Sequence, residues 1–199
     1  PQVTLTCTPS PATATSGTTI TWTATAGGLV PATTRYALFR KKVGNTEWTP
    51  PVASPAWQES NELRWTPGAE DVGTSEIIIW VKDGNTPASM NGYGFAAYCN
   101  PGPVQVVAPL TVTSTPSPAW VHHGTAITWT ATANGGVPAT TQFALFRKKP
   151  EDTEWTPPVS SPEWQAGNEL RWTPSPAEVG TWVIIIWVRD GNTPADMDG

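Results

Sequence analysis

The chain has 199 residues and a net charge of −5, and only 14% of its residues are charged. An acidic chain without a basic stripe argues against a nucleic acid as the partner. The sequence contains no run of about 18 apolar residues, so we predict that it does not insert into a membrane.

The hydrophobic pattern predicts an all-β fold. Residues 18–26 alternate between apolar side chains, such as Ile20 and Trp22, and threonines, which is typical of a strand with one buried face. Residues 77–81 are apolar on both faces, so we expect a central strand covered on both sides. Short strands separated by turn residues are typical of an immunoglobulin-like β-sandwich. The first half of the chain has seven such segments, at 3–8, 18–26, 36–42, 46–49, 61–66, 77–81 and 94–99.

The same pattern occurs twice. TTITWTATA at 18–26 returns as TAITWTATA at 125–133, and Trp22 and Trp129 lie 107 residues apart. A repeat of this length indicates a string of like domains.

We therefore predict two tandem immunoglobulin-like sandwich modules, residues 1–108 and 109–199. The second copy stops at the equivalent of Gly92, so we expect it to lack the last strand of the sandwich. In the first module that segment is 94–107.

Two stretches carry a resemblance to known proteins: TTRYALFRKKVGNTEWTPP, from residue 33, and NELRWTPGAEDVGTSEIIIWVKD, from residue 61. They resemble the immunoglobulin-like and fibronectin type III-like repeats of large secreted bacterial proteins, and they are similar to the triple-tyrosine sandwich modules of bacterial sensors. The resemblance implies a spacer, stalk, adhesin or surface-fibre unit without catalytic residues. Unlike immunoglobulin domains proper, the strands with Trp22 and Trp80 contain no cysteine that could join the two sheets.

The two cysteines lie at opposite ends of the first module. Cys7 belongs to its first expected strand and Cys99 to its last, and Ser114 replaces Cys7 in the second module. Because these strands can lie side by side in a sandwich, we predict an intrachain disulfide. Two free buried thiols and a cross-link between chains are the alternatives.

Tryptophan is abundant, with 12 residues. We expect Trp22, Trp65 and Trp80 to pack in or against the core. A second group lies beside prolines and could either pack or offer exposed stacking platforms for a sugar: Trp48, Trp57, Trp155 and Trp164. Trp120 and Trp182 occur only in the second module, which suggests a contact between modules or chains.

Candidate chemical sites are weak. His122 and His123 are adjacent, so on a strand they would point to opposite faces and chelate a metal poorly. The pairs Asp190 and Asn192, and Asp196 and Asp198, place oxygen ligands at alternate positions, but their spacing does not match that of a calcium loop. No nucleophile–base set is evident. We therefore expect no enzyme activity, no catalytic or metal-binding residue and no cofactor.

The resulting hypothesis is a structural module of a bacterial extracellular filament, stalk or surface fibre. Its expected partners are copies of itself, in a head-to-tail polymer or a longer tandem array. We expect a strand to complete the second module, either from a neighbouring subunit or from an identical continuation of the same polypeptide beyond residue 199. One alternative is a carbohydrate-binding or adhesive module, with glycans as partners. The other is a spacer in a large secreted enzyme or sensor. All three place the chain outside the cell or on its surface.

Overall fold

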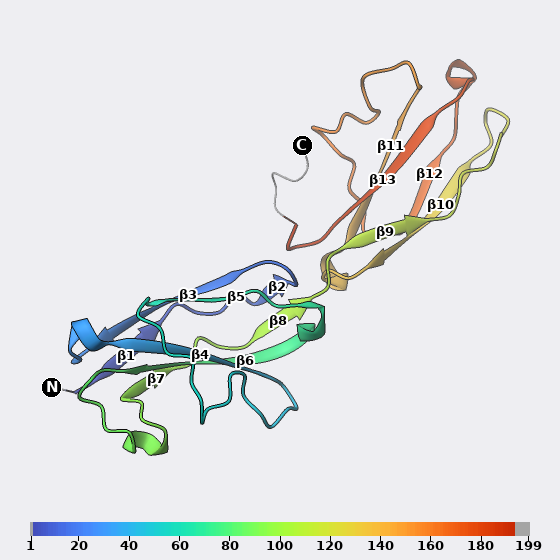
Figure 1. The fold of residues 1–199 in the computed structure, drawn as a ribbon. Helices are drawn as coiled ribbons and strands as arrows, with labels where there is room; N and C mark the ends of the chain where they lie inside the picture. The colour runs from blue at the N-terminus through green and yellow to red at the C-terminus, as the bar shows by residue number, and fades with distance from the viewer. Residues whose placement is uncertain (1, 194–199) are drawn as a thin grey trace. The chain divides into compact units, whose positions relative to one another are not determined.

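The computed structural model describes residues 2–193. The chain divides into two compact units, Pro1–Val107 (unit 1) and Ala108–Gly199 (unit 2). Figure 1 shows that each unit is built from strands. Residue n of unit 1 corresponds to residue n + 107 of unit 2.

Unit 1 is a sandwich of two sheets. One sheet has the order β1-β3-β5, and the other has the order β2-β8-β6-β4, with β7 also paired to β6. All pairs are antiparallel except β2 and β8, which run parallel. This confirms the predicted all-β, immunoglobulin-like fold. The strands are β1 (Thr4–Cys7), β2 (Thr13–Thr15), β3 (Ile20–Gly27), β4 (Arg35–Lys42), β5 (Glu62–Trp65), β6 (Gly73–Lys82), β7 (Ala97–Cys99) and β8 (Val104–Val107).

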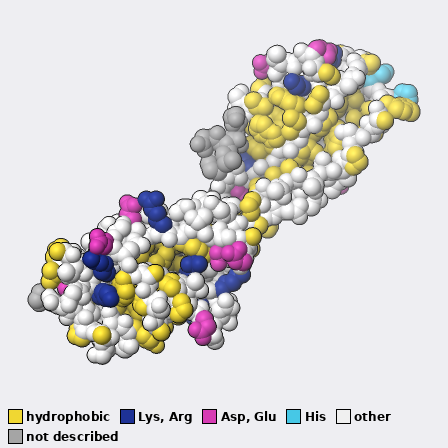
Figure 2. Space-filling model, in the orientation of Figure 1, with side chains coloured by type: hydrophobic (Ala, Val, Ile, Leu, Met, Phe, Trp, Pro, Cys, Tyr) yellow, Lys and Arg dark blue, Asp and Glu magenta, His cyan; other side chains and the backbone are white. Residues whose placement is uncertain are grey.

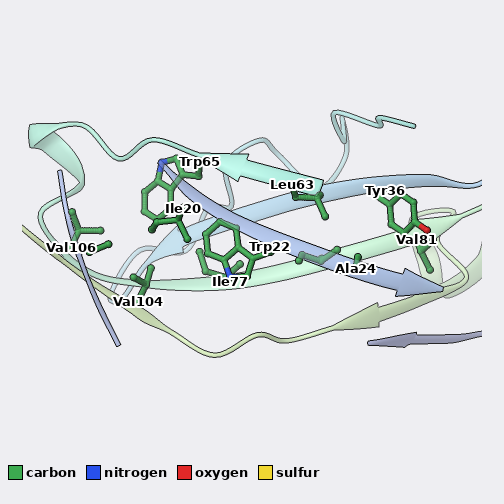
Figure 3. Packing of buried hydrophobic residues seen from close by; sticks show 12 residues of the cluster. Ile20, Trp22, Ala24, Tyr36, Leu63, Trp65, Ile77, Val81, Val104 and Val106 are labelled. Atoms are coloured by element: carbon green, nitrogen blue, oxygen red, sulfur yellow. The ribbon is translucent and has the colours of Figure 1, made fainter. Parts of the chain in front are cut away.

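The core of unit 1 lies between the two sheets. The alternation predicted for β3 is confirmed, because Ile20, Trp22 and Ala24 are buried and the intervening threonines are exposed. Figure 3 shows these side chains pointing toward those of β5, β6 and β8. Trp22 is fully buried, and its Nε1 donates a hydrogen bond to Ser10 Oγ at 3.0 Å. The period of two along β3 therefore decides which side chains form the core.

Unit 2 repeats part of this arrangement. Its sheets have the orders β9-β10-β12 and β11-β13. Trp129 pairs with Leu170 as Trp22 pairs with Leu63, and Trp129 is buried as predicted. The strands of unit 2 are β9 (Thr111–Ser114), β10 (Ile127–Asn134), β11 (Gln142–Lys148), β12 (Glu169–Trp172) and β13 (Val183–Arg189).

Two expectations about strands were wrong, and one strand was missed. Residues 46–49 form no strand, and only Thr49 makes an isolated bridge, to Arg40, because the prolines that follow cannot donate to a ladder. The last strand does not run from 94 to 99 but is divided into β7 and β8 around Pro101 and Pro103. The three-residue strand β2 was not predicted, because so short a segment carries no clear alternation.

Candidate assembly edge of unit 2

The equivalent strands β6 and β13 differ in their neighbours. β6 pairs with β4 along one edge, and with β8 and β7 along the other. β13 pairs with β11, and no strand within residues 2–193 forms a ladder with its other edge, which we call the open edge, although β9 of the other sheet lies near β13. β13 is also shorter: β6 begins at Gly73, where it pairs with β8, whereas β13 begins at Val183, the equivalent of Glu76.

The hydrogen-bond pattern shows which backbone groups face the open edge. Phe143 and Arg147 of β11 exchange hydrogen bonds with Gln165 and Thr156, along the edge of β11 that faces away from β13. Antiparallel ladders alternate, so Ala144 and Phe146 bond to β13, through their partners Trp187 and Ile185. The N–H groups that point to the open edge are consequently those of Ile184, Ile186 and Val188. Such unpaired groups are a template for another strand.

The side chains next to the open edge are less buried than their counterparts. Ile77, Ile79 and Val81 of β6 are 0% exposed, and they share a core cluster with Val104 and Val106 of β8. Their equivalents Ile184, Ile186 and Val188 are only half-buried. Figure 2 shows hydrophobic side chains gathered on the visible surface of unit 2. The open edge therefore exposes apolar surface as well as backbone.

The segment equivalent to β2 also lies unpaired. In unit 1, β2 pairs with β8, but residues 120–122 form no strand. Trp120 is 76% exposed, and its ring forms a T-shaped contact with the His122 ring at a centroid distance of 5.5 Å. His122 and His123 are exposed, as expected for a turn.

Trp182 contacts another tryptophan of unit 2. Its ring lies 5.1 Å from that of Trp172, the equivalent of the core residue Trp65. Its Nε1 donates a hydrogen bond to the backbone oxygen of Glu178 at 2.7 Å. The backbone N–H of Ser175 donates to the Glu178 carboxylate and, with the Ser175 hydroxyl and the Arg147 charge, holds the pKa of that carboxyl below its usual value. The ring contact and the hydrogen bond from Nε1 together hold the side chain of Trp182 against Trp172, which is itself half-buried.

Tryptophans that the sequence analysis named as possible sugar platforms cover the outer face of the sheet that contains β4 and β6. In unit 1, Trp48 and Trp57 pack, half-buried, against a cluster that contains Phe39, Trp80 and Phe95. Trp80 stacks on Phe95 with centroids 4.2 Å apart, so β6 is covered on both faces, as predicted.

Each of these half-buried indoles also meets a cation of its own chain. Lys82 Nζ lies 4.4 Å from the Trp57 ring, and Lys41 Nζ lies 5.0 Å from the Trp48 ring. In unit 2, Arg189 lies over Trp164 at 4.2 Å, and Lys148 lies over Trp155 at 5.2 Å. A sugar that stacked on these faces would have to displace a cation. A ligand-binding role for the four residues stays a prediction.

The predicted disulfide between Cys7 and Cys99 is confirmed. It joins β1 to β7 with a Cα–Cα distance of 6.2 Å. These strands belong to different sheets, so the disulfide links the two sheets of the sandwich rather than neighbouring strands within one sheet. A disulfide fits an extracellular domain.

The carboxylates of Asp83 and Asp190 stabilise equivalent turns in the two units by accepting hydrogen bonds. Asp83 accepts hydrogen bonds from the N–H groups of Val30 and Asn85 and from the Thr86 hydroxyl, and these bonds, led by that from Val30, lower the pKa of its carboxyl. Asp190 accepts the equivalent bonds in unit 2. In the part of the chain that the structure describes, no group of three or more His, Cys, Asp or Glu is placed to hold a metal. Asp196 and Asp198 lie outside the described residues.

Comparisons with known proteins reveal likenesses of low similarity. No family model matches the chain. No curated protein matches it. The solved structures that are similar in fold include an amphioxus IgVJ-C2 molecule, the four N-terminal immunoglobulin domains of Dscam1 isoform 6.9, and a marsupial T cell receptor.

The amphioxus molecule has 16% identity and a TM-score of 0.34, with 89% of this chain and 98% of that chain covered. Dscam1 has 15% identity and a TM-score of 0.36, with 90% and 39% covered, so this chain spans about two fifths of its length. The receptor has 10% identity and a TM-score of 0.29, with 95% and 61% covered.

Within residues 2–193 no helix is both long and apolar enough to cross a bilayer.

Proposed function

We propose that this chain is a structural module of an extracellular fibre or stalk, and that a strand from a neighbouring molecule completes unit 2 at the open edge. The resemblance of the two quoted sequence stretches suggests a secreted bacterial array. The single observation that carries the proposal is the contrast between β6, which pairs with strands along both edges, and β13, which within residues 2–193 pairs with β11 alone.

The energetics favour such a strand. Full burial of a valine or isoleucine side chain contributes roughly 1.5–3 kcal/mol. Ile184, Ile186 and Val188 are half-buried, so covering them adds several kcal/mol in all. An added strand also pairs the backbone groups of the same three residues. Repeated between like molecules, such a contact need not close and can build a filament.

A proline substitution tests the pairing itself. The N–H of Ile184 faces the open edge, so Ile184→Pro removes a donor from that edge without removing a bond to β11. The matched control is Ile184→Ala, which removes apolar surface from the same position but keeps the backbone N–H. If a strand adds at this edge, light scattering will show association of the native chain and of Ile184→Ala, but little of Ile184→Pro.

Equal association of the two variants would show that unspecific apolar contact, and not strand addition, drives assembly. A native chain that stays monomeric at every concentration would contradict the proposal outright. Circular dichroism of each variant verifies that the sandwich remains folded.

A further inference from the structure

The positions that flank the missing strand carry larger side chains in unit 2 than in unit 1. In unit 1, Ser75 pairs with Val104, and Ala14 pairs with Val106. The equivalents of Ser75 and Ala14 are Trp182 and Val121. Both changes lie on neighbours of the open edge, one on each side of the place that β8 occupies in unit 1.

In unit 1 these four side chains fill one end of the core. Ser75 is 3% exposed, and Val104 and Val106 are 0% exposed. Figure 3 shows Val104 and Val106 at the end of the core where Ile20 and Trp65 lie. Directly opposite residues of an antiparallel pair have their Cβ atoms roughly 4.5–5.5 Å apart. The small side chain of Ser75 therefore leaves space for its partner Val104, and a much larger side chain in its place would compete for that space.

In unit 2 the two positions that would face such a strand carry the bulkier side chains of Trp182 and Val121. Trp182 lies against Trp172, the equivalent of Trp65, and the hydrogen bond from its Nε1 to Glu178 fixes the indole there. A strand entering in the register of β8 would place its Val104 equivalent opposite this indole. Its Val106 equivalent would face Val121, whose side chain is bulkier than that of Ala14 in unit 1. Overpacking at such a position weakens binding by about 5- to 150-fold.

We infer that the strand completing unit 2 carries alanine or glycine at the two positions equivalent to Val104 and Val106, and so is not a copy of β8. This rests on the proposed function, in which a neighbouring molecule supplies the strand. The occupant is thus an extended peptide segment with two small, inward-facing residues that are separated by one outward-facing residue. Trp182 and Val121 are the residues that select it.

Two peptides and two chains test the selection. Both peptides copy residues 93–108 with Cys99→Ser, and the second also carries Val104→Ala and Val106→Ala. The chains are the native protein and the variant Trp182→Ser with Val121→Ala, which restores the residues of unit 1. Fluorescence anisotropy of labelled peptide gives the four dissociation constants. We expect the native chain to bind the alanine peptide at least about 5-fold more tightly, and the variant to prefer the valine peptide.

The outcomes separate the two proposals. If both chains bind with the same preference, residues 121 and 182 do not select the strand and the inference is wrong, although strand addition stands. If neither chain binds either peptide, the edge accepts no strand, and the proposed function fails with the inference.

A second measurement does not depend on the stability of the altered unit 2. Ser75→Trp in unit 1 should speed hydrogen exchange of the β8 amides, and adding Val104→Ala should slow it again. If the second change brings no recovery, the two side chains do not compete for space and the inference is overturned.

Discussion

Replacing Trp22 with alanine removes the largest side chain from the core of unit 1. Trp22 is fully buried, and large-to-small substitutions of buried aromatic residues cost about 3–5 kcal/mol. Ser10 Oγ accepts the bond from Trp22 Nε1 and itself donates to the Gly102 oxygen, so the variant also leaves an acceptor without its partner. That loss adds about 1 kcal/mol. We therefore expect Trp22→Ala to lower the free energy of unfolding of unit 1 by roughly 4–6 kcal/mol.

The assay must report on each unit separately. Urea unfolding followed by pulsed hydrogen exchange and mass spectrometry yields one transition from peptides of unit 1 and another from peptides of unit 2. Thr21→Ala is the matched control, because Thr21 is exposed on the same strand and should cost less than about 0.5 kcal/mol. A cost for Trp22→Ala below about 1 kcal/mol would refute the assignment of the inner face of β3.

Three further predictions follow from the same structure. Non-reducing peptide mapping should find Cys7 bonded to Cys99, and Cys7→Ser with Cys99→Ser should destabilise unit 1 by about 2–4 kcal/mol; two alkylatable thiols in the native protein would exclude the bridge. Trp80→Ala should cost more than Trp187→Ala in urea unfolding, because Trp80 is buried against Phe95 whereas Trp187 is half-buried; equal costs would mean that unit 2 is as well covered as unit 1. Because the pKa of Asp83 is lowered in the folded state, its contribution to stability is present above about pH 4 and is lost as the pH falls through the folded-state pKa. Acid should therefore destabilise unit 1 of the native protein more steeply than unit 1 of the Asp83→Asn variant, and parallel curves of stability against pH would contradict this.

Much of the fold could be predicted because it depends on local alternation. The threonines that alternate with Ile20, Trp22 and Ala24 decide the inner face of β3 without reference to any other strand. The apolar run at 77–81 likewise indicates a strand covered on both faces, and Trp80 and Ile79 are buried on opposite sides of β6. The disulfide could be predicted because Cys7 and Cys99 lie in strands at the two ends of one module.

The remainder depends on contacts between distant segments. Nothing local in the sequence shows that the loop with Trp48 and Trp57 folds back over the outer face of the β4–β6 pair, or that lysines from these strands meet the indoles. The contact of Trp182 with Trp172 was missed for the same reason. One signal was present: comparing the two copies at the partners of Val104 and Val106 would have revealed Ser75 and Ala14 exchanged for larger residues.

Residue-resolved hydrogen exchange of β13 tests the central claim most directly. The amides to follow are those of Ile184, Ile186 and Val188, with Ile77, Ile79 and Val81 of β6 as internal controls. We predict that the β13 amides exchange fast in dilute solution and slow down as the protein associates, while the β6 amides stay slow throughout. Fast exchange of the β13 amides in associated protein, or full protection in a monomer, would contradict completion of unit 2 by a strand from a neighbouring molecule.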